Sequence, residues 1–417
     1  MRSSPTVSLV MAPLLLAGYL IWGGWAITHD KPIDFYAYYA AADALNRGQP
    51  LYHANPEQEA LNPIPGLPGI LPPYIYPPAL ASLLRPLARL TPPVAAFLWM
   101  ILNSVGLVLG AWILGTSLDD ERGRQVALLA MAGFVPPLTS LYAGQFNGLV
   151  WLGLAAIFHL GIGPRQFGMN GQPCPEQSRR DAGRRSIAAA LSGIILGATI
   201  LLKPLLWSSA IFFAWQRRWL VVLTCIAGTL LLVLVSAAFD GLTPWREFLS
   251  IAPQLSSTTT TAYPPNQSLY GFALRAFTTH EYGASLALQP AWAAPFAALL
   301  SLALVGATMA LTWNRSGAQQ PARFALWLIT GLLVTPLSWL HHLLLALLPI
   351  LIIGTVALKH RAWGALAACG LAYLLIDVQG LAWHSLVGNT LLLSLGTYGM
   401  LILWSILAVW LVRNKLE

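Results

Sequence analysis

One carboxylate in this chain stands apart, because it directly follows the first long apolar run and lies among aromatic side chains. Asp34 opens the segment DFYAYYAAADALNR (34–47), which reads as a short amphipathic helix that ends at Gly48. A single carboxylate within hydrogen-bond reach of a hydroxyl can act as a general base and remove its proton. Asp34 is therefore the candidate base for a reaction in which an acceptor hydroxyl is the nucleophile.

Asp34 also has a purely structural interpretation. Asp is favoured at a helix N-cap, where its charge suits the helix dipole. Capping alone does not account for the neighbouring Tyr36 and Tyr38. Asp43 lies nine residues further on, rotated by about 180° on an ideal helix. We expect Asp43 to be solvated or to pair with Arg47 at i+4, and not to share a site with Asp34.

The amino-acid composition limits the class of protein in which such a base would act. The chain has 417 residues, of which 57% are hydrophobic and only 9% are charged, against about 25% charged in ordinary soluble domains. This excludes a soluble globular protein, a disordered chain and a nucleic-acid binder. The three Cys have no metal-like spacing, and neither His-x3-His nor a Gly-rich phosphate loop occurs. We expect no cofactor and no built-in metal site, and we leave dependence on a divalent metal open.

The apolar runs predict a single all-α membrane domain over residues 1–417, a bundle of about ten to twelve transmembrane helices. The first run, Val7–Ile27, is read as a retained helix and not as a signal peptide. The others are roughly 93–115, 126–142, 146–162, 187–202, 204–215, 219–239, 291–313, 324–340, 343–358, 362–376 and 386–411. The pair 187–202 and 204–215 is short, so it forms either two full spans or a tight, partly re-entrant hairpin.

The Lys and Arg residues assign sides to this map. If the N-terminus is inside, 16 of the 23 Lys and Arg fall on inner segments and 7 on outer ones. This bias follows the positive-inside rule. It predicts cytoplasmic N- and C-termini in a plasma membrane, a basic cytoplasmic loop at 163–186, and two long extracytoplasmic loops at 28–92 and 240–290.

Polar residues distant in sequence recur where apolar runs end on the predicted outer side. They are Asp34 and Asp43, Gln145 and Asn147, Lys203, Asn266, Gln267 and Ser268, Ser338, Trp339, His341 and His342, then Asp377 and His384. Polar groups are costly at membrane depth, so this convergence predicts a cavity at the outer surface. Snorkelling of Lys203 and interfacial packing of the two His are the structural alternatives. Adjacent helical residues point about 100° apart, so at most one His faces the cavity.

Several short motifs in fixed order resemble those of a known family. In the predicted first outer loop they are Asp34-Phe-Tyr-x-Tyr-Tyr, Gly48-x-x-Leu51-Tyr52, Tyr74-x-Tyr76-Pro77-Pro78 and Leu84-x-Pro86-Leu87. Further on they are Gly144-Gln145-x-Asn147, Lys203-Pro204, Asn266-Gln267-Ser268-Leu269 with Arg275, and Pro336-x-Ser338-Trp339-x-His341-His342 with Pro349. Together they resemble glycosyltransferase family 87, one of the C-type membrane glycosyltransferases, over about residues 30–350.

The resemblance implies inverting transfer from a polyprenyl-phosphate sugar donor to a lipid or glycan acceptor at the extracytoplasmic face. Family members include mannosyltransferases and arabinofuranosyltransferases of mycobacterial envelope glycans, so either sugar fits. The family's catalytic Asp maps to Asp34. Developing charge on the leaving phosphate needs fixed cations or donors, for which Lys203, Arg275 and one of His341 or His342 are the candidates. The candidates for sugar and acceptor contacts are Tyr36, Tyr76, Gln145, Asn147, Asn266, Gln267 and Trp339.

Two other functions remain as alternatives. A polymerase or ligase of envelope polysaccharide would also place its site outward, but it would take a diphosphate-linked oligosaccharide. A lipid or sugar transporter would carry its binding residues near the membrane midplane on broken helices, often in repeated halves. The sequence has neither a repeat of fixed period nor acids in the middle of its apolar runs.

Overall fold

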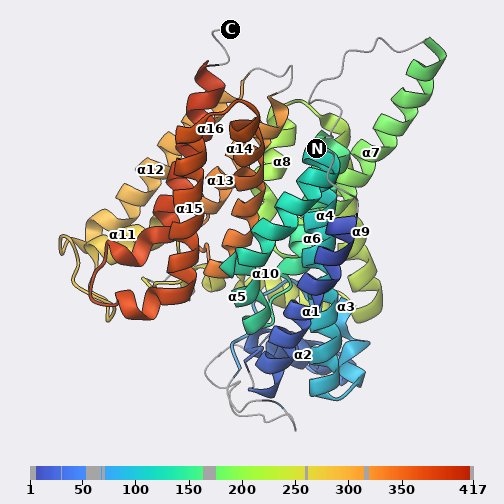
Figure 1. Cartoon of the computed structure of the whole chain (residues 1–417). Helices are drawn as coiled ribbons and strands as arrows, with labels where there is room; N and C mark the ends of the chain where they lie inside the picture. The colour runs from blue at the N-terminus through green and yellow to red at the C-terminus, as the bar shows by residue number, and fades with distance from the viewer. Residues whose placement is uncertain are drawn as a thin grey trace.

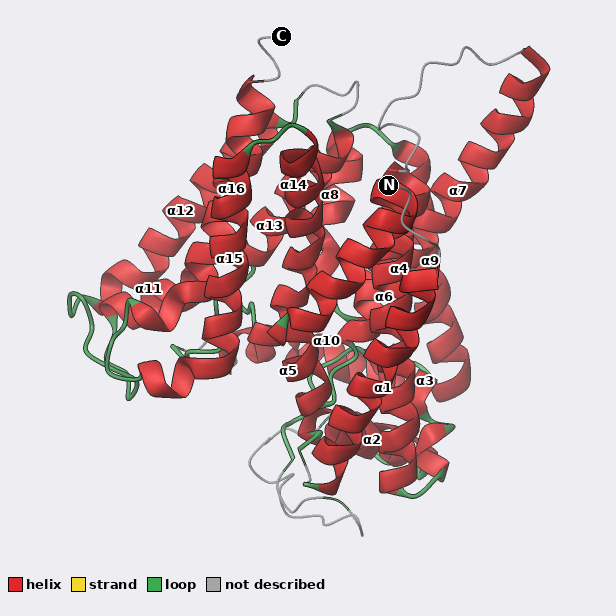
Figure 2. Ribbon diagram, viewed as in Figure 1, coloured by secondary structure: helices red, strands yellow, loops and turns green. Residues whose placement is uncertain are grey.

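The computed structural model describes residues 6–29, 31–52, 67, 71–162, 175–258, 262–313 and 319–413, and every named regular element within them is a helix (Figures 1 and 2). Residues 163–174 of the predicted basic loop lie outside the described residues, as do 53–66 of the first outer loop. The α2 and α3 helices lie at one end of the bundle, and the last turns of α16 lie at the other (Figure 1).

The helices follow the hydropathy map closely. Their bounds are α1 (Thr6–Thr28), α2 (Ile33–Asn46), α3 (Pro78–Leu84), α4 (Pro92–Gly133), α5 (Val135–Ala143), α6 (Asn147–Ile157), α7 (Pro175–Leu202), α8 (Trp207–Trp215), α9 (Trp219–Asp240), α10 (Thr243–Thr258), α11 (Leu269–Phe277), α12 (Pro290–Leu311), α13 (Gln320–Val334), α14 (Leu347–Lys359), α15 (Trp363–Ala382) and α16 (Leu395–Arg413). Short 3-10 segments precede α8 (Pro204–Leu206) and α14 (Leu340–Ala346) and follow α15 (Trp383–Leu386).

Eight helices of the described residues are long and apolar enough to cross a membrane, which confirms the predicted all-α polytopic class. The other four predicted runs appear as a pair bent by 58°, Glu121–Gly133 with Val135–Ala143, and as three shorter apolar helices. The shorter ones are Asn147–Ile162, Pro204–Trp215 and Gln320–Val334.

The α4 element covers the predicted inner turn between two apolar runs, but it consists of two straight parts, Pro92–Leu118 and Glu121–Gly133, and the chain reverses between them. A Cβ atom built on Gly115 would lie 2.5 Å from the Cα atom of Arg124. Nine residues of a straight helix span about 13.5 Å, so the two halves of α4 must lie side by side. The Arg124 guanidinium donates to Glu121 and lies 4.9 Å from the centre of the Trp112 ring. The two parts of α4 are therefore antiparallel, as the sequence predicts for the runs 93–115 and 126–142.

The core depends on close backbone approach between helices that small residues allow. A Cβ atom on Gly148 of α6 would lie 2.3 Å from the backbone oxygen of Asn103 in α4, and one on Gly106 would lie 2.7 Å from the Gly148 oxygen. Small residues commonly mediate such contacts in membranes, where van der Waals packing replaces the hydrophobic driving force. The α4–α6 contact fixes the start of α6, where Asn147 lies, and the turn before it, which holds Gln145.

We expect Gly148→Ala to destabilise the protein by about 1–3 kcal/mol, because the added methyl group overlaps the α4 backbone. The measurement is the midpoint of thermal unfolding of detergent-purified protein, followed by tryptophan fluorescence. Gly306→Ala in α12 is the matched control, since no atom lies within 4 Å of its built Cβ. Equal midpoints for the two variants would contradict the importance of the α4–α6 approach.

Candidate active site

A cavity of about 730 Å³ lies where the first loop meets the ends of several helices. Its walls come from α1, α2, the segment before α3, α5 and the α5–α6 turn, the loop before α11, the segment before α14, and the end of α15. The lining residues are Trp22, Asp34, Ala37, Tyr38, Pro72, Pro73, Ile75, Tyr76, Val135, Leu138, Thr139, Tyr142, Ala143, Gln145, Tyr263, Pro265, Trp339, Leu340, His341, Gly380, Leu381, Trp383 and His384. Segments distant in sequence therefore meet at one cavity, as the sequence predicts.

Asp34 lies in the first turn of α2 and not at its N-cap, which is Pro32. Asp34 is therefore not the N-cap residue, although its carboxylate does lie in the first turn, where its charge suits the helix dipole. Its Oδ2 atom accepts a hydrogen bond of 2.7 Å from Nε2 of Gln145. Gly144 adopts a left-handed φ of 74°, and a Cβ atom there would lie 2.7 Å from Cβ of Phe35. Only glycine allows α2 and the Gln145 turn to approach this closely.

Lys203 lies behind Gln145 at the break between α7 and α8. Its Nζ atom donates to Oε1 of Gln145 at 2.5 Å and to Oδ1 of Asn147 at 2.8 Å. Asn147 in turn donates from Nδ2 to the backbone oxygen of His341 at 3.0 Å. A continuous chain of hydrogen bonds thus connects Asp34, Gln145, Lys203, Asn147 and the backbone of His341. Lys203 is buried and is not among the residues that line the cavity.

Two tyrosines complete the surroundings of the Gln145 amide. The hydroxyl groups of Tyr38 and Tyr76 donate to Oε1 of Gln145 at 2.9 and 3.4 Å. With Lys203, three donors face this one oxygen atom. The amide is therefore held in the orientation that points its NH₂ group at Asp34. Both tyrosines also pack edge-on against Phe146, which fixes their rings.

Burial shifts the pKa values of Asp34 and Lys203 in opposite directions. Burial raises the pKa of the Asp34 carboxyl group above its ordinary value, although the Gln145 hydrogen bond and the charge of Lys203 act in the opposite direction. Burial lowers the pKa of the Lys203 ammonium group to about 7, and the charge of Asp34 opposes that shift. A carboxyl group with a raised pKa is better suited to accept and hold a proton near neutral pH.

The structure distinguishes the two adjacent histidines. His341 lines the cavity, and within the described residues its Nε2 atom has no hydrogen-bond partner. His342 is buried, and its Nδ1 atom accepts from the backbone nitrogen of Trp339 at 3.2 Å. His342 therefore stabilises the start of the 3-10 segment, whereas His341 forms part of the cavity wall.

Three of the sequence candidates lie outside the cavity, in a separate buried cluster. Arg275 donates to Oγ of Ser394 at 2.9 Å and to the backbone oxygen of Asn266 at 2.8 Å. The Asn266 side chain accepts from the backbone of Ser338, and Gln267 donates to the backbone oxygen of Leu393. These residues satisfy the backbone that supports the cavity wall, and the structure does not place them where they would contact a phosphate or a sugar.

Other residues singled out from the sequence contribute to the fold and do not line the cavity. Tyr36 is buried in the core of the first loop and does not line the cavity. The predicted pair of Asp43 with Arg47 is confirmed, with 2.5 Å between Oδ2 and Nη2. Gly48 has a φ of 66° just after α2, which confirms it as the helix stop. Asp377 accepts from the backbone nitrogen of Val135 at 2.8 Å and so holds the start of α5.

Sequence reasoning assigned Tyr76 and Trp339 to the cavity but not the other aromatic residues that form its wall. Tyr263 packs edge-on against Trp339 and Trp383, with ring centres 5.9 and 5.3 Å apart. Trp22 and Tyr142 form a second aromatic group, with ring centres 6.5 Å apart. Aromatic residues at helix ends are common at membrane interfaces, so their positions alone did not separate a binding role from anchoring.

The described residues contain no group of three or more His, Cys, Asp or Glu that could hold a metal ion. The chemical groups that line the cavity are the Asp34 carboxylate, the imidazole rings of His341 and His384, several hydroxyl groups and aromatic faces. A buried base beside a cavity that opens at helix ends is an arrangement that suits transfer to a hydroxyl acceptor.

The family model for glycosyltransferase family 87 matches residues 74–336, more than half of the chain, and the protein belongs to this family of membrane glycosyltransferases. Two known proteins of Mycolicibacterium smegmatis are similar to it along most of their length. A polyprenol-phosphate-mannose-dependent α-(1-2)-phosphatidylinositol pentamannoside mannosyltransferase is 24% identical, covering 90% of this chain and 85% of the relative. A polyprenol-phosphate-mannose-dependent α-(1-2)-phosphatidylinositol mannoside mannosyltransferase is 25% identical, covering 88% and 81%. No solved structure matches the chain.

The lowered pKa of Lys203 predicts a specific dependence of stability on pH. Between about pH 7 and the unfolded value of 10.5, the unfolded state binds more protons at Lys203 than the folded state does. Its contribution to the free energy of unfolding therefore rises with pH across this window. We expect Lys203→Met to remove that rise, seen as a smaller change in the midpoint of thermal unfolding from pH 7 to pH 9. Lys31→Met is the control, and equal slopes for all three proteins would contradict the prediction.

Proposed function

We propose that the protein transfers a mannosyl residue from polyprenyl-phosphate mannose to a hydroxyl group of a glycolipid acceptor, within the Asp34 cavity. Family membership supports an enzyme of glycosyl transfer. The names of both relatives support the mannosyl donor and an acceptor of the phosphatidylinositol mannoside class. We further propose that the cavity faces the extracytoplasmic side of the plasma membrane, because the Lys and Arg bias assigns the opposite end of the bundle to the cytoplasm.

The observation that carries the proposal is the arrangement around Asp34. Gln145 holds the carboxylate through Oδ2, and within the described residues no hydrogen bond is made by Oδ1. Oδ1 is therefore the acceptor for the proton of the attacking hydroxyl. The cavity is large enough to hold sugar rings, and its aromatic side chains offer flat apolar faces for them.

The transfer needs one proton acceptor and one stabilised leaving group. As the acceptor oxygen forms its bond to the anomeric carbon, its proton passes to Asp34. The bond from the anomeric carbon to the phosphate oxygen breaks on the opposite side, and its electron pair stays with polyprenyl phosphate. The configuration at the anomeric carbon is thereby inverted. A phosphate leaves as a stable anion, so no general acid is required.

His341 is the group best placed to assist the leaving phosphate. His341 lines the cavity, and its buried Nε2 atom has no hydrogen-bond partner among the described residues. The sequence also suggested Lys203 for direct phosphate contact, but its Nζ atom donates to Gln145 and Asn147 behind the wall. Lys203 acts instead through its positive charge near the site and through the orientation of Gln145.

The first test is a matched pair of substitutions on α2, assayed with radiolabelled polyprenyl-phosphate mannose and a phosphatidylinositol mannoside acceptor. We expect Asp34→Asn to lower transfer at least 10²-fold, because it removes the base. Asp43→Asn, which alters only the pair with Arg47, is expected to transfer at nearly the wild-type rate.

The outcome of that assay separates several alternatives. Undiminished transfer by Asp34→Asn would show that the base lies elsewhere. Transfer of arabinofuranose in place of mannose, tested in parallel with its polyprenyl-phosphate donor, would overturn the choice of sugar. Acceptance of a diphosphate-linked oligosaccharide alone would favour a polymerase or ligase.

The two adjacent histidines provide a second test. We expect His341→Ala to reduce kcat/KM for transfer by about 10²–10³-fold, the usual effect of removing one donor to a developing anion. Its unfolding midpoint should stay near that of the wild type. His342→Ala should show the reverse, a loss of stability of about 1 kcal/mol from the lost backbone contact, with a smaller effect on turnover. Equal effects of both variants on kcat/KM would contradict the assignment.

A further inference from the structure

A second cavity, of about 840 Å³, lies between the C-terminal half of α14, the N-terminal half of α15 and the C-terminal half of α16. The Asp34 cavity is bordered by the opposite ends of α14 and α15, where His341 and Trp383 lie. The two cavities therefore lie at opposite ends of the same helices. A ligand of the second cavity is independent of both substrates of the proposed transfer.

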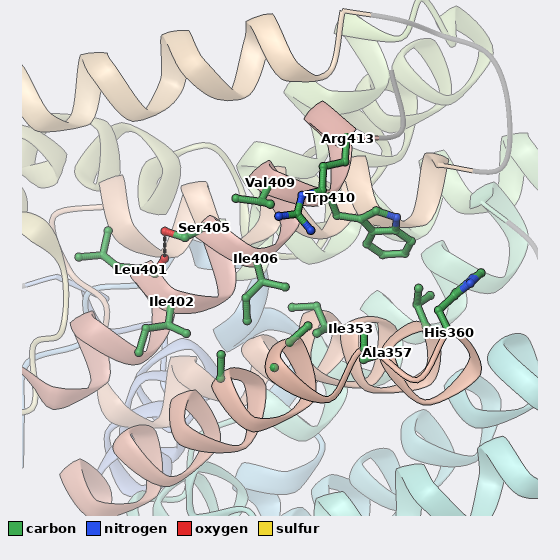
Figure 3. Close-up of a pocket in the computed structure, with 15 residues that line it drawn as sticks. Ile353, Ala357, His360, Leu401, Ile402, Ser405, Ile406, Val409, Trp410 and Arg413 are labelled. Atoms are coloured by element: carbon green, nitrogen blue, oxygen red, sulfur yellow. Dashed lines mark hydrogen bonds between the residues drawn. The ribbon is translucent and has the colours of Figure 1, made fainter. Parts of the chain in front are cut away.

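The walls of this groove are apolar and open because one side is built from small residues. Small residues line the groove on the side of α14 and α15, namely Ala357, Ala362, Gly364, Ala365 and Ala368. The larger Leu401, Ile402, Ile406 and Val409 of α16 line it opposite Ala357 (Figure 3). A Cβ atom built on Gly364 would have no atom within 4 Å, so this glycine borders open space. The Ser405 hydroxyl donates to the backbone oxygen of Leu401, so its donor is already satisfied within α16.

The rim of the groove carries cations and an indole ring. Arg413 and Trp410 lie at the end of α16, and His360 lies across from them at the end of α14 (Figure 3). Lys359 and Arg361 flank His360 and are exposed. Within the described residues, none of these four basic side chains takes part in an ion pair or a hydrogen bond.

The dimensions of the groove match one half of a bilayer. From Leu401 to Arg413 the α16 helix rises about 18 Å, and half of a bilayer's hydrocarbon core is about 15 Å thick. A hydrocarbon chain in the groove would place its headgroup beside Arg413 and Trp410, where aromatic and basic residues suit the interface. Basic pockets between transmembrane helices attract anionic lipid headgroups.

We propose that this groove is a binding site for an anionic diacyl phospholipid of the leaflet opposite the Asp34 cavity. An acyl chain occupies the space above the small residues of α15, and the phosphate lies between Arg413 and His360. The charge of the headgroup complements Arg413 and the neighbouring Lys359 and Arg361, which form no ion pair with a carboxylate of the described residues.

Native mass spectrometry of delipidated protein tests this directly. The protein is incubated with an equimolar mixture of phosphatidylglycerol and phosphatidylcholine that have the same acyl chains, and retained lipid is counted. We expect retention of phosphatidylglycerol over phosphatidylcholine. Arg413→Gln should reduce this preference about 5-fold, which is the equivalent of about 1 kcal/mol per basic residue at a membrane surface. Ala365→Phe, which fills the groove, should reduce retention of both lipids.

Arg185→Gln is the matched control, because Arg185 is also an exposed cation of the described residues but lies on α7, outside the groove. It should keep the wild-type preference. An equal loss with Arg185→Gln would show a general surface effect and overturn the site. Full preference in Arg413→Gln, or wild-type retention in Ala365→Phe, would overturn it as well. Sugar transfer is not part of the readout, so failure here leaves the proposed function untouched.

Discussion

A buried ammonium group organises the interior beside the Asp34 cavity. Lys203 cannot reach bulk water, so its three donors need partners, and it takes the side-chain oxygens of Gln145 and Asn147. Each amide then has only its NH₂ group to offer. Gln145 turns that group to Asp34, and Asn147 turns it to the backbone that carries His341. One charge therefore sets the orientation of both sides of the cavity.

Breaks in helices put this charge and its partners in place. Pro204 lacks a backbone N–H and follows Lys203, which adopts an extended conformation between α7 and the next helical turn. Gly144 ends α5 in a left-handed conformation just before Gln145. Asp34 and His341 lie in the first turns of their own helical segments. The apolar spans supply rigid supports, and polar side chains appear where regular backbone stops.

Much of this arrangement could be predicted from residue types. The apolar runs located the spans because a membrane selects for continuous hydrophobicity, and helix ends located Asp34, Gln145, Lys203 and His341 near one surface. Arg275 has the same signature in the sequence but lies buried against Ser394. Which polar group at a helix end faces a cavity depends on packing between distant helices, and periodicity does not record that. The contact of Lys203 with Gln145 was hidden for the same reason.

The hydrogen-bonded chain from residue 34 to residue 341 has a consequence for biogenesis. Its members emerge from the ribosome far apart in time, and the last of them follows most of the spans. A nascent chain that has inserted only its early helices holds Lys203 without its final neighbours. The hydrogen-bonded chain is therefore completed only after the segment that carries His341 has been inserted.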